Sequence, residues 1–451
     1  MSGVILEDQT RENISFAGKK QEVMSMEKKS VSFLLVAALL LFGLVPIFAG
    51  GSTQSKAAGP INIEWWNLWD ANIADGVIAD FQAANPNITV TRTQHGDPEI
   101  WDAMVVATAT KAGPDIFYNW SGPYQKSFYQ KGSAISLNDY AKQYGWMDRL
   151  YKAATDQVTY DGKLTLIPYG FNAVGVMYKK SIFDQFGLKE PTTWAEMATL
   201  CDTLVKNGVL PFSIGGSDTW HTMGWTDAAL EQFCGPALHD KLNNTDDTSV
   251  SWNCPQVIAA FTDMSKWISR GWVDQNFAGV SADEANMPVF TGKAAMNVTG
   301  DWTQANIKDA GFNSADYGFF PFPRDGGKGR LVTFVSGVAL SNFNGKDKTD
   351  AAAKFIDFML KPESVNKYIP LMGTLSGVKG APIDPSAAFL QLVNKYMAVS
   401  DVYPPTDGVL PEQPVDVYYR LGTEIILGTT SPADAAKQMA DAIDTSRTVQ
   451  K

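Results

Sequence analysis

Tryptophan is the residue type in this sequence that is best placed to do chemistry on a small molecule. An indole ring offers an apolar face and one N–H donor. Because the C–H face of a pyranose is apolar and its rim carries hydroxyls, stacking on indole beside charged hydrogen-bond acceptors suits a neutral sugar. Of the 13 tryptophans in 451 residues, six stand near predicted strand ends or in loops: Trp66, Trp69, Trp120, Trp220, Trp225 and Trp302. Core packing is the alternative role, which we expect for four others on or next to predicted helices: Trp194, Trp252, Trp267 and Trp272.

The dipeptide Asp301-Trp302 is the strongest candidate for a binding site. The carboxylate could accept hydrogen bonds from two hydroxyls of one ligand, and such charge-assisted bonds are about twice as strong as neutral ones. The competing role for Asp301 is the N-cap of a predicted helix over 303–307. Both roles cannot easily use the same oxygens, so the two alternatives stay open.

Motifs for catalysis and for metal binding are missing from the sequence. There is no G-x-S-x-G, H-E-x-x-H or P-loop, and no G-x-G-x-x-G that opens a helix after a strand. Three cysteines and three histidines are scattered without the spacing of metal ligands. Acidic residues are abundant, so composition alone leaves room for a glycosidase carboxylate pair, but no pair is singled out. We expect no enzymatic activity and no cofactor.

The charge balance and the first 60 residues indicate a secreted protein. A formal net charge of −11 argues against nucleic acid as a partner. Residues 26–49 are typical of a cleaved signal peptide, with a basic start, the apolar run 31–48 and small residues after it. Since the apolar run approaches the roughly 18–20 residues that span a bilayer, an uncleaved membrane anchor is the alternative.

The sequence around the signal peptide sets three further expectations. Residues 1–25 are polar and unlike the start of a signal peptide, so we expect a non-native extension and a natural start at Met24 or Met26. Residues 50–60 have the composition of a linker. No cysteine lies near the cleavage site, which argues against a lipid anchor and favours a free periplasmic protein.

The elements that must position the candidate residues alternate between strand and helix. Hydrophobic patterns predict strands over 61–66, 88–93 and 115–118, and helices over 73–84, 99–112 and 123–131. Such alternation predicts an α/β fold with a mainly parallel sheet and helices on both faces. Ligands of these sheets sit beyond the carboxyl ends of the strands, where the tryptophan-rich segments fall.

The stretch from Thr159 to Trp194 holds the most specific pattern. A hairpin-type turn at Asp161-Gly162 precedes an extended run that Pro168 is expected to stop, and an apolar strand is predicted over 171–178. A short helix over 181–186 then ends at Gly187, and Thr193-Trp194-Ala195-Glu196 matches a capping box. The whole series reads DGK…P…N…YxKxxFxxxGLxxPTTWxEM.

This series resembles the extracellular solute-binding proteins of ABC sugar importers, of the maltose-binding-protein-like type. In that family the series marks the first crossing of the chain between two lobes. Residues 292–302 resemble the family block G-K-A-A-M-x-x-x-G-x-W, a strand that ends at the interlobe cleft. Residues 317–323 and 372–379 resemble the second and third crossings.

The resemblance implies a two-lobed periplasmic-binding-protein fold of type II with several interlobe crossovers. Lobe one would comprise 61–167 and 322–372, and lobe two 168–321 and 373–451. The implied function is capture of a mono- or short oligosaccharide in an aromatic cleft and its delivery to an ABC transporter permease. Members of the family are mostly monomers, so a monomer is expected. The alternatives are the same fold with another solute, namely glycerol-3-phosphate, a polyamine or an opine, or a secreted carbohydrate-active enzyme.

The resemblance also implies the ligand-binding residues. They are expected after the predicted strands, in the loop after GGSD, in the block ending at residue 302 and on a C-terminal helix: Trp66, Asn67, Trp69, Gln94, His95, Trp120, Trp220, His221, Asp301, Trp302 and Tyr418. These segments are aromatic and acidic, whereas a phosphate ligand would require Arg or Lys. Arg330 is the one cation that the pattern leaves without a place.

The three cysteines have two alternative states. In an oxidising compartment Cys234 and Cys254 could form a disulfide, closing a loop of about 20 residues and contributing roughly 3 kcal/mol. Cys201 is expected to be a buried thiol. The alternative is three free thiols.

Overall fold

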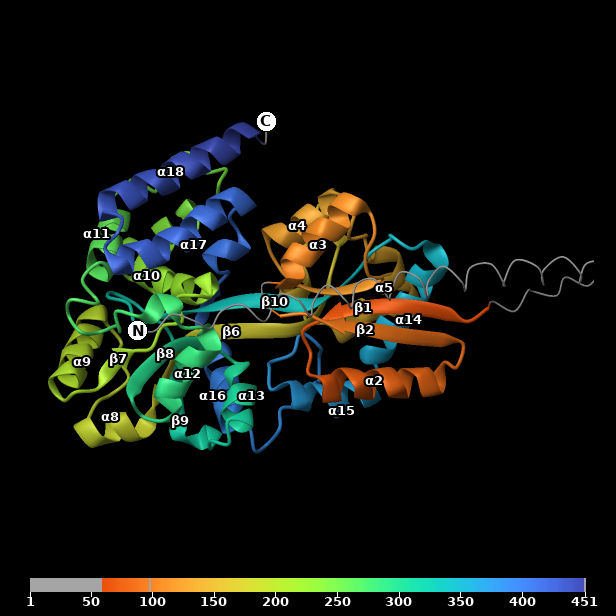
Figure 1. Ribbon diagram of the computed structural model, residues 1–451, viewed down its shortest axis with the longest axis horizontal. Coiled ribbons are helices and arrows are strands. Elements are labelled where there is room, and N and C mark those ends of the chain that lie inside the picture. The colour runs from red at the N-terminus through yellow and green to blue at the C-terminus, as the bar shows by residue number, and fades with distance from the viewer. Residues whose placement is uncertain (1–58, 97–98, 450–451) are drawn as a thin grey trace, which may run out of the picture. The chain divides into compact units, whose positions relative to one another are not determined.

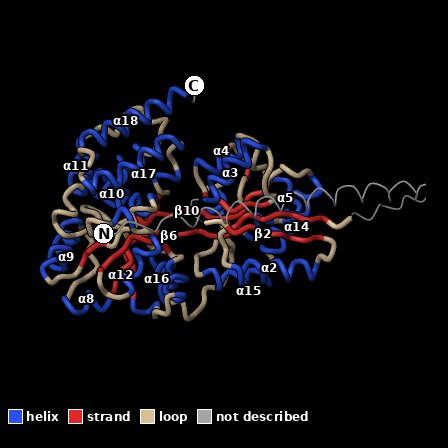
Figure 2. Tube along the Cα trace, viewed as in Figure 1, coloured by secondary structure: helices blue, strands red, loops and turns tan. Residues whose placement is uncertain are grey.

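A computed structural model describes residues 59–96 and 99–449 of the chain. The predicted extension and signal peptide lie outside the described residues, as does the linker except for its last two residues. The described chain forms a nine-stranded mixed sheet with helices on both faces, and a separate two-stranded hairpin (Figures 1 and 2). Within the described ranges, no helix has the length and apolar character needed to cross a membrane.

The first part of the sheet follows the alternation of the sequence. Strand β1 pairs in parallel with β2 along its whole length, and with β3 near its end. Helices α2 and α15 lie on one side of these strands, and α3 and α4 on the other (Figure 1). The elements are β1 (Ile61–Asn67), α2 (Ala71–Ala84), β2 (Ile88–Gln94), α3 (Glu99–Thr110), β3 (Ile116–Trp120) and α4 (Pro123–Gln130).

Short elements then lead to the first long strand. Helices α5 (Asn138–Tyr144), α6 (Trp146–Arg149) and α7 (Lys152–Asp156) precede the hairpin of β4 (Thr159–Tyr160) and β5 (Lys163–Leu164). The predicted turn is confirmed, since Asp161 and Gly162 both take positive φ between two antiparallel strands.

Two long strands, β6 (Ile167–Lys179) and β10 (Arg330–Leu340), run side by side through the centre of the sheet (Figure 1). The strand order is β2-β1-β3-β10-β6-β8-β7, with β9 on β6 and β11 on β10. Strand β10 is antiparallel to β3 and β6, and β6 is antiparallel to β8 and β9. The prediction of a mainly parallel sheet is therefore corrected to a mixed one, because the two long strands run in opposite directions.

The sequence predicted that Pro168 ends an extended run. This prediction is wrong, because Pro168 lies inside β6. Its partner is Gly337, where the register of β6 and β10 shifts. Proline has no N–H to give to the ladder, and such residues are tolerated in sheets at irregular positions.

The helices after β6 begin and end where the local signals predict. Helix α8 (Lys180–Phe186) ends at Gly187 with φ 64°, and α9 (Trp194–Lys206) begins with the capping box of Thr193 and Glu196. The next elements are β7 (Leu210–Phe212), α10 (Thr219–Leu242), α11 (Pro255–Met264), η2 (Phe277–Gly279), α12 (Ala282–Phe290), β8 (Ala294–Gly300), α13 (Thr303–Asp309), η3 (Ser314–Asp316) and β9 (Tyr317–Phe320). After β10 come α14 (Lys346–Met359), α15 (Pro362–Met372), α16 (Ala388–Met397), β11 (Asp401–Tyr403), η4 (Thr406–Gly408), α17 (Glu412–Leu427) and α18 (Pro432–Val449).

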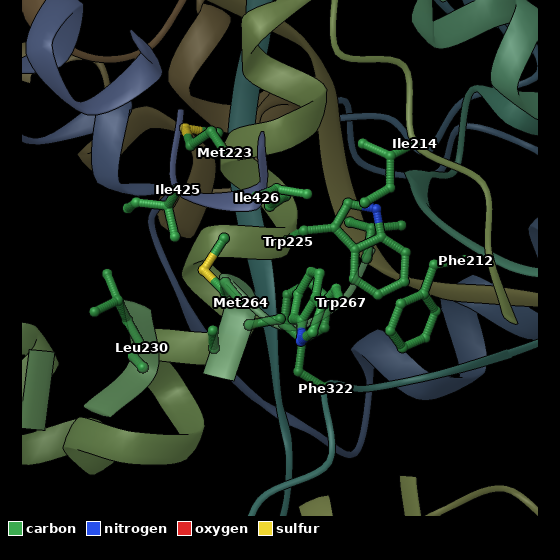
Figure 3. Close-up of a cluster of buried hydrophobic side chains, with 14 of the residues drawn as sticks. Phe212, Ile214, Met223, Trp225, Leu230, Met264, Trp267, Phe322, Ile425 and Ile426 are labelled. Carbon is green, nitrogen blue, oxygen red and sulfur yellow. The ribbon is translucent and has the colours of Figure 1, made fainter. Parts of the chain in front are cut away.

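Two large clusters of buried hydrophobic side chains share the long strands. The first cluster includes Ile167 of β6 and Val335 of β10, together with side chains of β1, α2 and α14. The second includes Val176 of β6 and Val332 of β10, together with side chains of α9, α10, α11 and α17. Figure 3 shows part of the second cluster, where Trp225 and Trp267 pack beside Phe212. Trp225, a candidate from its position in the sequence, is thus a core residue.

The three cysteines are free thiols, so the proposed disulfide between Cys234 and Cys254 is not formed. Both residues pack against the second cluster while only partly buried. Burial raises the pKa of the Cys234 thiol to about 12, so the reactive thiolate is scarce at neutral pH. Cys201 is buried, as predicted.

Candidate functional site

A cavity of about 520 Å³ lies beyond the carboxyl end of β3, where β6, β8 and β10 meet. Its volume falls in the range of roughly 300–1,000 Å³ that is typical of small-molecule sites. Side chains from several strands and the turns after them line it, including Trp120 at the end of β3, Trp302 after β8 and Phe334 of β10.

Four aromatic residues of the lining contact one another: Trp101, Tyr118, Trp120 and Tyr124. The ring of Trp101 stacks on Tyr124, with centroids 4.5 Å apart and planes at 17°, and meets Trp120 edge-on at 5.0 Å. Its Nε1 donates a hydrogen bond to Asn119 Oδ1 at 3.0 Å. We call these four residues the first aromatic wall.

Only Trp120 of this wall was among the predicted ligand contacts. Trp101 lies in the first turn of α3, whose pattern suggested an ordinary amphipathic helix, and Tyr124 lies at the start of α4. Their positions in the sequence could have indicated a role in the site, since both helices follow strand ends on the side where ligands of α/β sheets bind.

The second aromatic wall consists of Trp220, Trp302 and Phe334. Trp302 meets Trp220 and Phe334 with ring centroids 5.8 Å away in each case. The indole of Trp302 lies over Gly300, where an added Cβ would come within 2.0 Å of the ring. The glycine therefore permits this ring position. Trp220 and Trp302 were both predicted, and the structure places both on the cavity.

Asp301 does not line the cavity and is completely buried behind it. Its carboxylate accepts hydrogen bonds from the backbone N–H groups of Ala173, at 3.1 Å, and Leu375, at 2.5 Å, and from the side chain of Asn172. The residue before α13 is Trp302, and the Asp301 side chain does not cap that helix. Asp301 instead joins β8 to β6 and to the segment 372–379.

The surroundings of Asp301 oppose its ionisation. Burial raises the pKa of its carboxyl to about 7, although the N–H groups of Leu375 and Ala173 lower it in part. No cation is among its hydrogen-bond partners. Asn172, which contacts it, does line the cavity.

Four aspartates line the cavity: Asp218, Asp227, Asp283 and Asp407. No Lys or Arg is among the described lining residues. Each carboxylate also accepts a hydrogen bond from the protein: Ala282 N–H to Asp218, Tyr418 O–H to Asp227, Asn306 to Asp283 and Tyr419 O–H to Asp407. Burial raises the pKa of Asp227. The lining is therefore acidic and rich in hydrogen-bond acceptors.

The predicted contacts at the ends of β1 and β2 lie outside the cavity lining: Trp66, Asn67, Trp69, Gln94 and His95. Asn67 is buried, and its Oδ1 accepts a hydrogen bond from the backbone of Trp69, whose ring packs on Trp65 and Tyr169. The ring of His95 lies 4.9 Å from that of Trp66. These contacts join residues at the ends of β1 and β2 to other parts of the protein, whereas Gln94 is exposed.

His221 and Tyr418 are buried and also lie outside the cavity lining. Nδ1 of the buried His221 accepts a hydrogen bond from Gly215 N–H at 2.8 Å, and burial lowers the pKa of the imidazole to about 4. Tyr418 is buried and reaches the cavity only through Asp227. Of the eleven predicted contacts, the structure brings Trp120, Trp220 and Trp302 together on the cavity.

Arg330, which the sequence left without a place, lies at the start of β10 in a buried ionic network. Its guanidinium donates to both Glu231 and Asp240 and lies 4.5 Å above the ring of Tyr403. Burial opposes ionisation of Glu231, but hydrogen bonds from Arg330 and His239 outweigh it and lower the Glu231 pKa to about 2. Arg330 is thus paired within the protein and does not line the cavity.

Comparison with known proteins gives a family and a fold. Residues 76–390 match the family model described as bacterial extracellular solute-binding protein. A multiple sugar-binding protein of Streptococcus mutans is 25% identical over 77% of this chain and 84% of its own length. A probable sugar-binding periplasmic protein of Brucella suis is 24% identical over 91% of this chain and 97% of its own length.

Solved structures share the fold. A chitin oligosaccharide binding protein superposes with a TM-score of 0.79, covering 85% of this chain and 98% of its own, at 21% sequence identity. The described chain therefore has the α/β fold of these binding proteins, with one mixed sheet flanked by helices.

Proposed function

The chain belongs to the bacterial extracellular solute-binding proteins, a family of binders and not of enzymes, and we propose that its solute is a neutral mono- or short oligosaccharide. The sugar would bind in the cavity between the two aromatic walls. The protein would then deliver it to the permease subunits of an ABC importer from the periplasm. The sugar-binding relatives support this proposal.

The observation that carries the proposal is the pairing of aromatic rings with carboxylates around one cavity. Trp120 of the first aromatic wall and Trp302 of the second offer apolar ring surface, and Asp218 and Asp283 offer carboxylate acceptors. A pyranose needs both, because its C–H faces are apolar and its hydroxyl rim donates hydrogen bonds.

The charge of the lining favours a neutral sugar over the anionic alternatives. Glycerol-3-phosphate is an anion and opines carry carboxylate groups, and four aspartates without Lys or Arg would repel the phosphate and those carboxylates. A polyamine would be attracted by the same aspartates. Against it, each aspartate already holds a hydrogen bond from the protein, and two aromatic walls suit flat apolar faces better than a flexible chain.

Capture would use motion between two lobes, divided as the resemblance implied (61–167 with 322–372, and 168–321 with 373–451). Strands β6 and β10 pass from one hydrophobic cluster to the other, and each contributes residues to the cavity. Bending of these strands would open and close the cavity in the manner of hinged binding proteins. A closed, sugar-loaded form would present the surface that the permease recognises.

A ligand panel tests the proposal. The purified protein is first examined by native mass spectrometry for a solute carried through purification, and then by tryptophan fluorescence and thermal shift. The panel contains glucose, galactose, xylose, maltose, sucrose, trehalose, raffinose, glycerol-3-phosphate and spermidine. Saturable stabilisation by one sugar is expected, since a ligand at about 100 times its Kd adds roughly 2.7 kcal/mol.

Three outcomes would contradict the proposal. A response to glycerol-3-phosphate or spermidine alone would keep the family and change the solute. A copurified solute that is not a carbohydrate would do the same. The third outcome is a recovered sugar that chromatography shows to be chemically changed, which would indicate a carbohydrate-active enzyme, because a binder returns its sugar unchanged.

A further inference from the structure

A chain of hydrogen bonds runs from the buried Asp301 to the cavity surface. Asn172 of β6 donates through Nδ2 to both carboxylate oxygens of Asp301, at 3.2 and 3.3 Å. Ser336 of β10 donates through Oγ to Asn172 Oδ1 at 2.8 Å. Asn172 and Ser336 line the cavity, although only 3% and 6% of their surfaces are exposed. The three residues thus come from β6, from β10 and from the turn directly after β8.

The chemistry of the groups sets the direction of each hydrogen bond. When Asp301 is ionised, its carboxylate only accepts, so the amide nitrogen of Asn172 must face Asp301 and the amide oxygen must face Ser336, as the structure shows. A carbonyl oxygen also only accepts, so Ser336 must use its single hydroxyl hydrogen for Asn172. The Ser336 oxygen then has only lone pairs left for the cavity.

Glycines next to these residues leave room for the arrangement. A Cβ on Gly170 would lie 2.2 Å from Ser336 Oγ and 3.0 Å from Asn172 Oδ1. The register of β6 and β10 shifts directly after Ser336, between it and Gly337. Such irregularities re-aim side chains next to binding sites.

We propose that Ser336 is a specificity-determining residue of the cavity, an acceptor that takes a hydrogen bond from one hydroxyl of the solute. Asn172 and Asp301 are positioning residues that hold Ser336 in this state. The site rejects a solute with hydrogen or an ether oxygen in place of that hydroxyl. The inference rests on the proposed function, since it requires a polyhydroxylated solute in this cavity.

Calorimetric titration at pH 8, above the Asp301 pKa of about 7, tests the proposal. The probe is the panel sugar that stabilises the protein most, with its complete set of mono-deoxy and mono-O-methyl derivatives. In the wild type, one hydroxyl position is expected where both modifications lower affinity about tenfold or more, the size of one hydrogen bond. Ser336→Ala should bind the parent sugar about tenfold more weakly and show no further loss for the deoxy derivative at that position.

Two more variants separate a positioning role from a structural one. In Asn172→Ala the Ser336 hydroxyl is free to donate, so the O-methyl derivative at that position should lose less of its affinity relative to the parent sugar than it does in the wild type. Ser121 is a matched control, because it also lines the cavity but its Oγ accepts from Val335 N–H. Ser121→Ala should leave the penalty at the Ser336-dependent position unchanged.

The outcomes distinguish this inference from the proposed function. If a sugar binds but Ser336→Ala shows the same penalty as the wild type at every position, Ser336 has no such role and the proposed function stands. If no sugar of the panel binds either protein, the proposed function fails and the inference fails with it.

Discussion

Two buried carboxylates, Glu231 and Asp301, hold the sheet in different ways. Glu231, on α10, receives hydrogen bonds from the cation Arg330 and from His239. Asp301, after β8, receives them only from two backbone N–H groups and an amide. Both residues are at most 1% exposed. Yet the pKa of Glu231 is lowered to about 2, whereas that of Asp301 is raised to about 7.

The difference shows that the partner, and not burial alone, decides the charge of a buried carboxyl group. A cation compensates for lost hydration, and neutral donors do so only in part. Glu231 therefore stays ionised at neutral pH and ties α10 to β10 permanently. Asp301 exchanges a proton near neutral pH at the place where β6, β8 and the segment 372–379 meet.

The largest effect is expected when the ionic network loses its centre. Glu231→Ala leaves Arg330 buried with Asp240 as its remaining carboxylate partner, and removing one partner of a buried pair costs about 3–5 kcal/mol. Urea unfolding at pH 7 measures this loss. Asp441→Ala, which breaks the exposed pair with Lys437, is the control and should change little. A loss as small as that of the control would remove the contrast between the two carboxylates.

The pH dependence of stability should carry opposite signs at the two sites. A carboxyl group with a raised pKa stabilises the protein fully below pH 4, and that contribution is lost as the pH rises to about 7. For Asp301 it amounts to about 4 kcal/mol. Glu231 has a lowered pKa, so the stabilisation that it contributes is fully present above pH 4.5 and is lost as the pH falls to about 2.

Asp301→Asn should therefore flatten the loss of stability between pH 4 and 7, measured by urea midpoints at each pH. Glu231→Gln should leave that range alone and flatten the decline on the acid side. Parallel profiles for the wild type and Asp301→Asn would show that Asp301 has an ordinary pKa.

Ligand binding tests whether the titration of Asp301 affects the neighbouring cavity residue. Trp302 directly follows Asp301, but its own side chain does not titrate. Trp302→Ala should weaken binding of the best panel sugar by about 2–3 kcal/mol, or roughly 30–150-fold in Kd. The loss should be equal at pH 5 and pH 8 by calorimetry. A loss that varies with pH would mean that the stacking and the titration of Asp301 are coupled.

The smallest effect is expected for a change that keeps the charge of the network. Arg330→Lys retains a cation but cannot place a planar fork on Glu231 and Asp240 at once, so we expect a loss of about 1–2 kcal/mol. The midpoint of urea unfolding measures it. Stability equal to that of the wild type would show that net charge, and not geometry, holds this site.

Local features of the fold were predictable because they depend on neighbours in the sequence. The turn at Asp161-Gly162, the capping box of Thr193 and the end of α8 at Gly187 all occur as predicted. The mixed pairing of the sheet was not predictable from the alternation of elements. Strand direction in the centre depends on how β6 and β10 pass between the two hydrophobic clusters.

The site was predictable only in part. Trp120, Trp220 and Trp302 lie on the cavity, whereas Trp66 and Trp69 lie outside its lining. In the sequence all five stand near predicted strand ends or in predicted loops, so the sequence offered no reason to separate them. Tyr124 and Trp101 were missed because their mutual stacking joins two helices.

By itself, the sequence determined the family, the local turns and caps, and the abundance of aromatic and acidic residues near strand ends. Only the tertiary structure decided which of these residues face the cavity and which carboxyl groups keep their charge. Asp301 is held by Leu375 and Ala173, which are 74 and 128 positions away. Desolvation and hydrogen bonding act through space, so the state of that carboxyl group exists only after the strands have met.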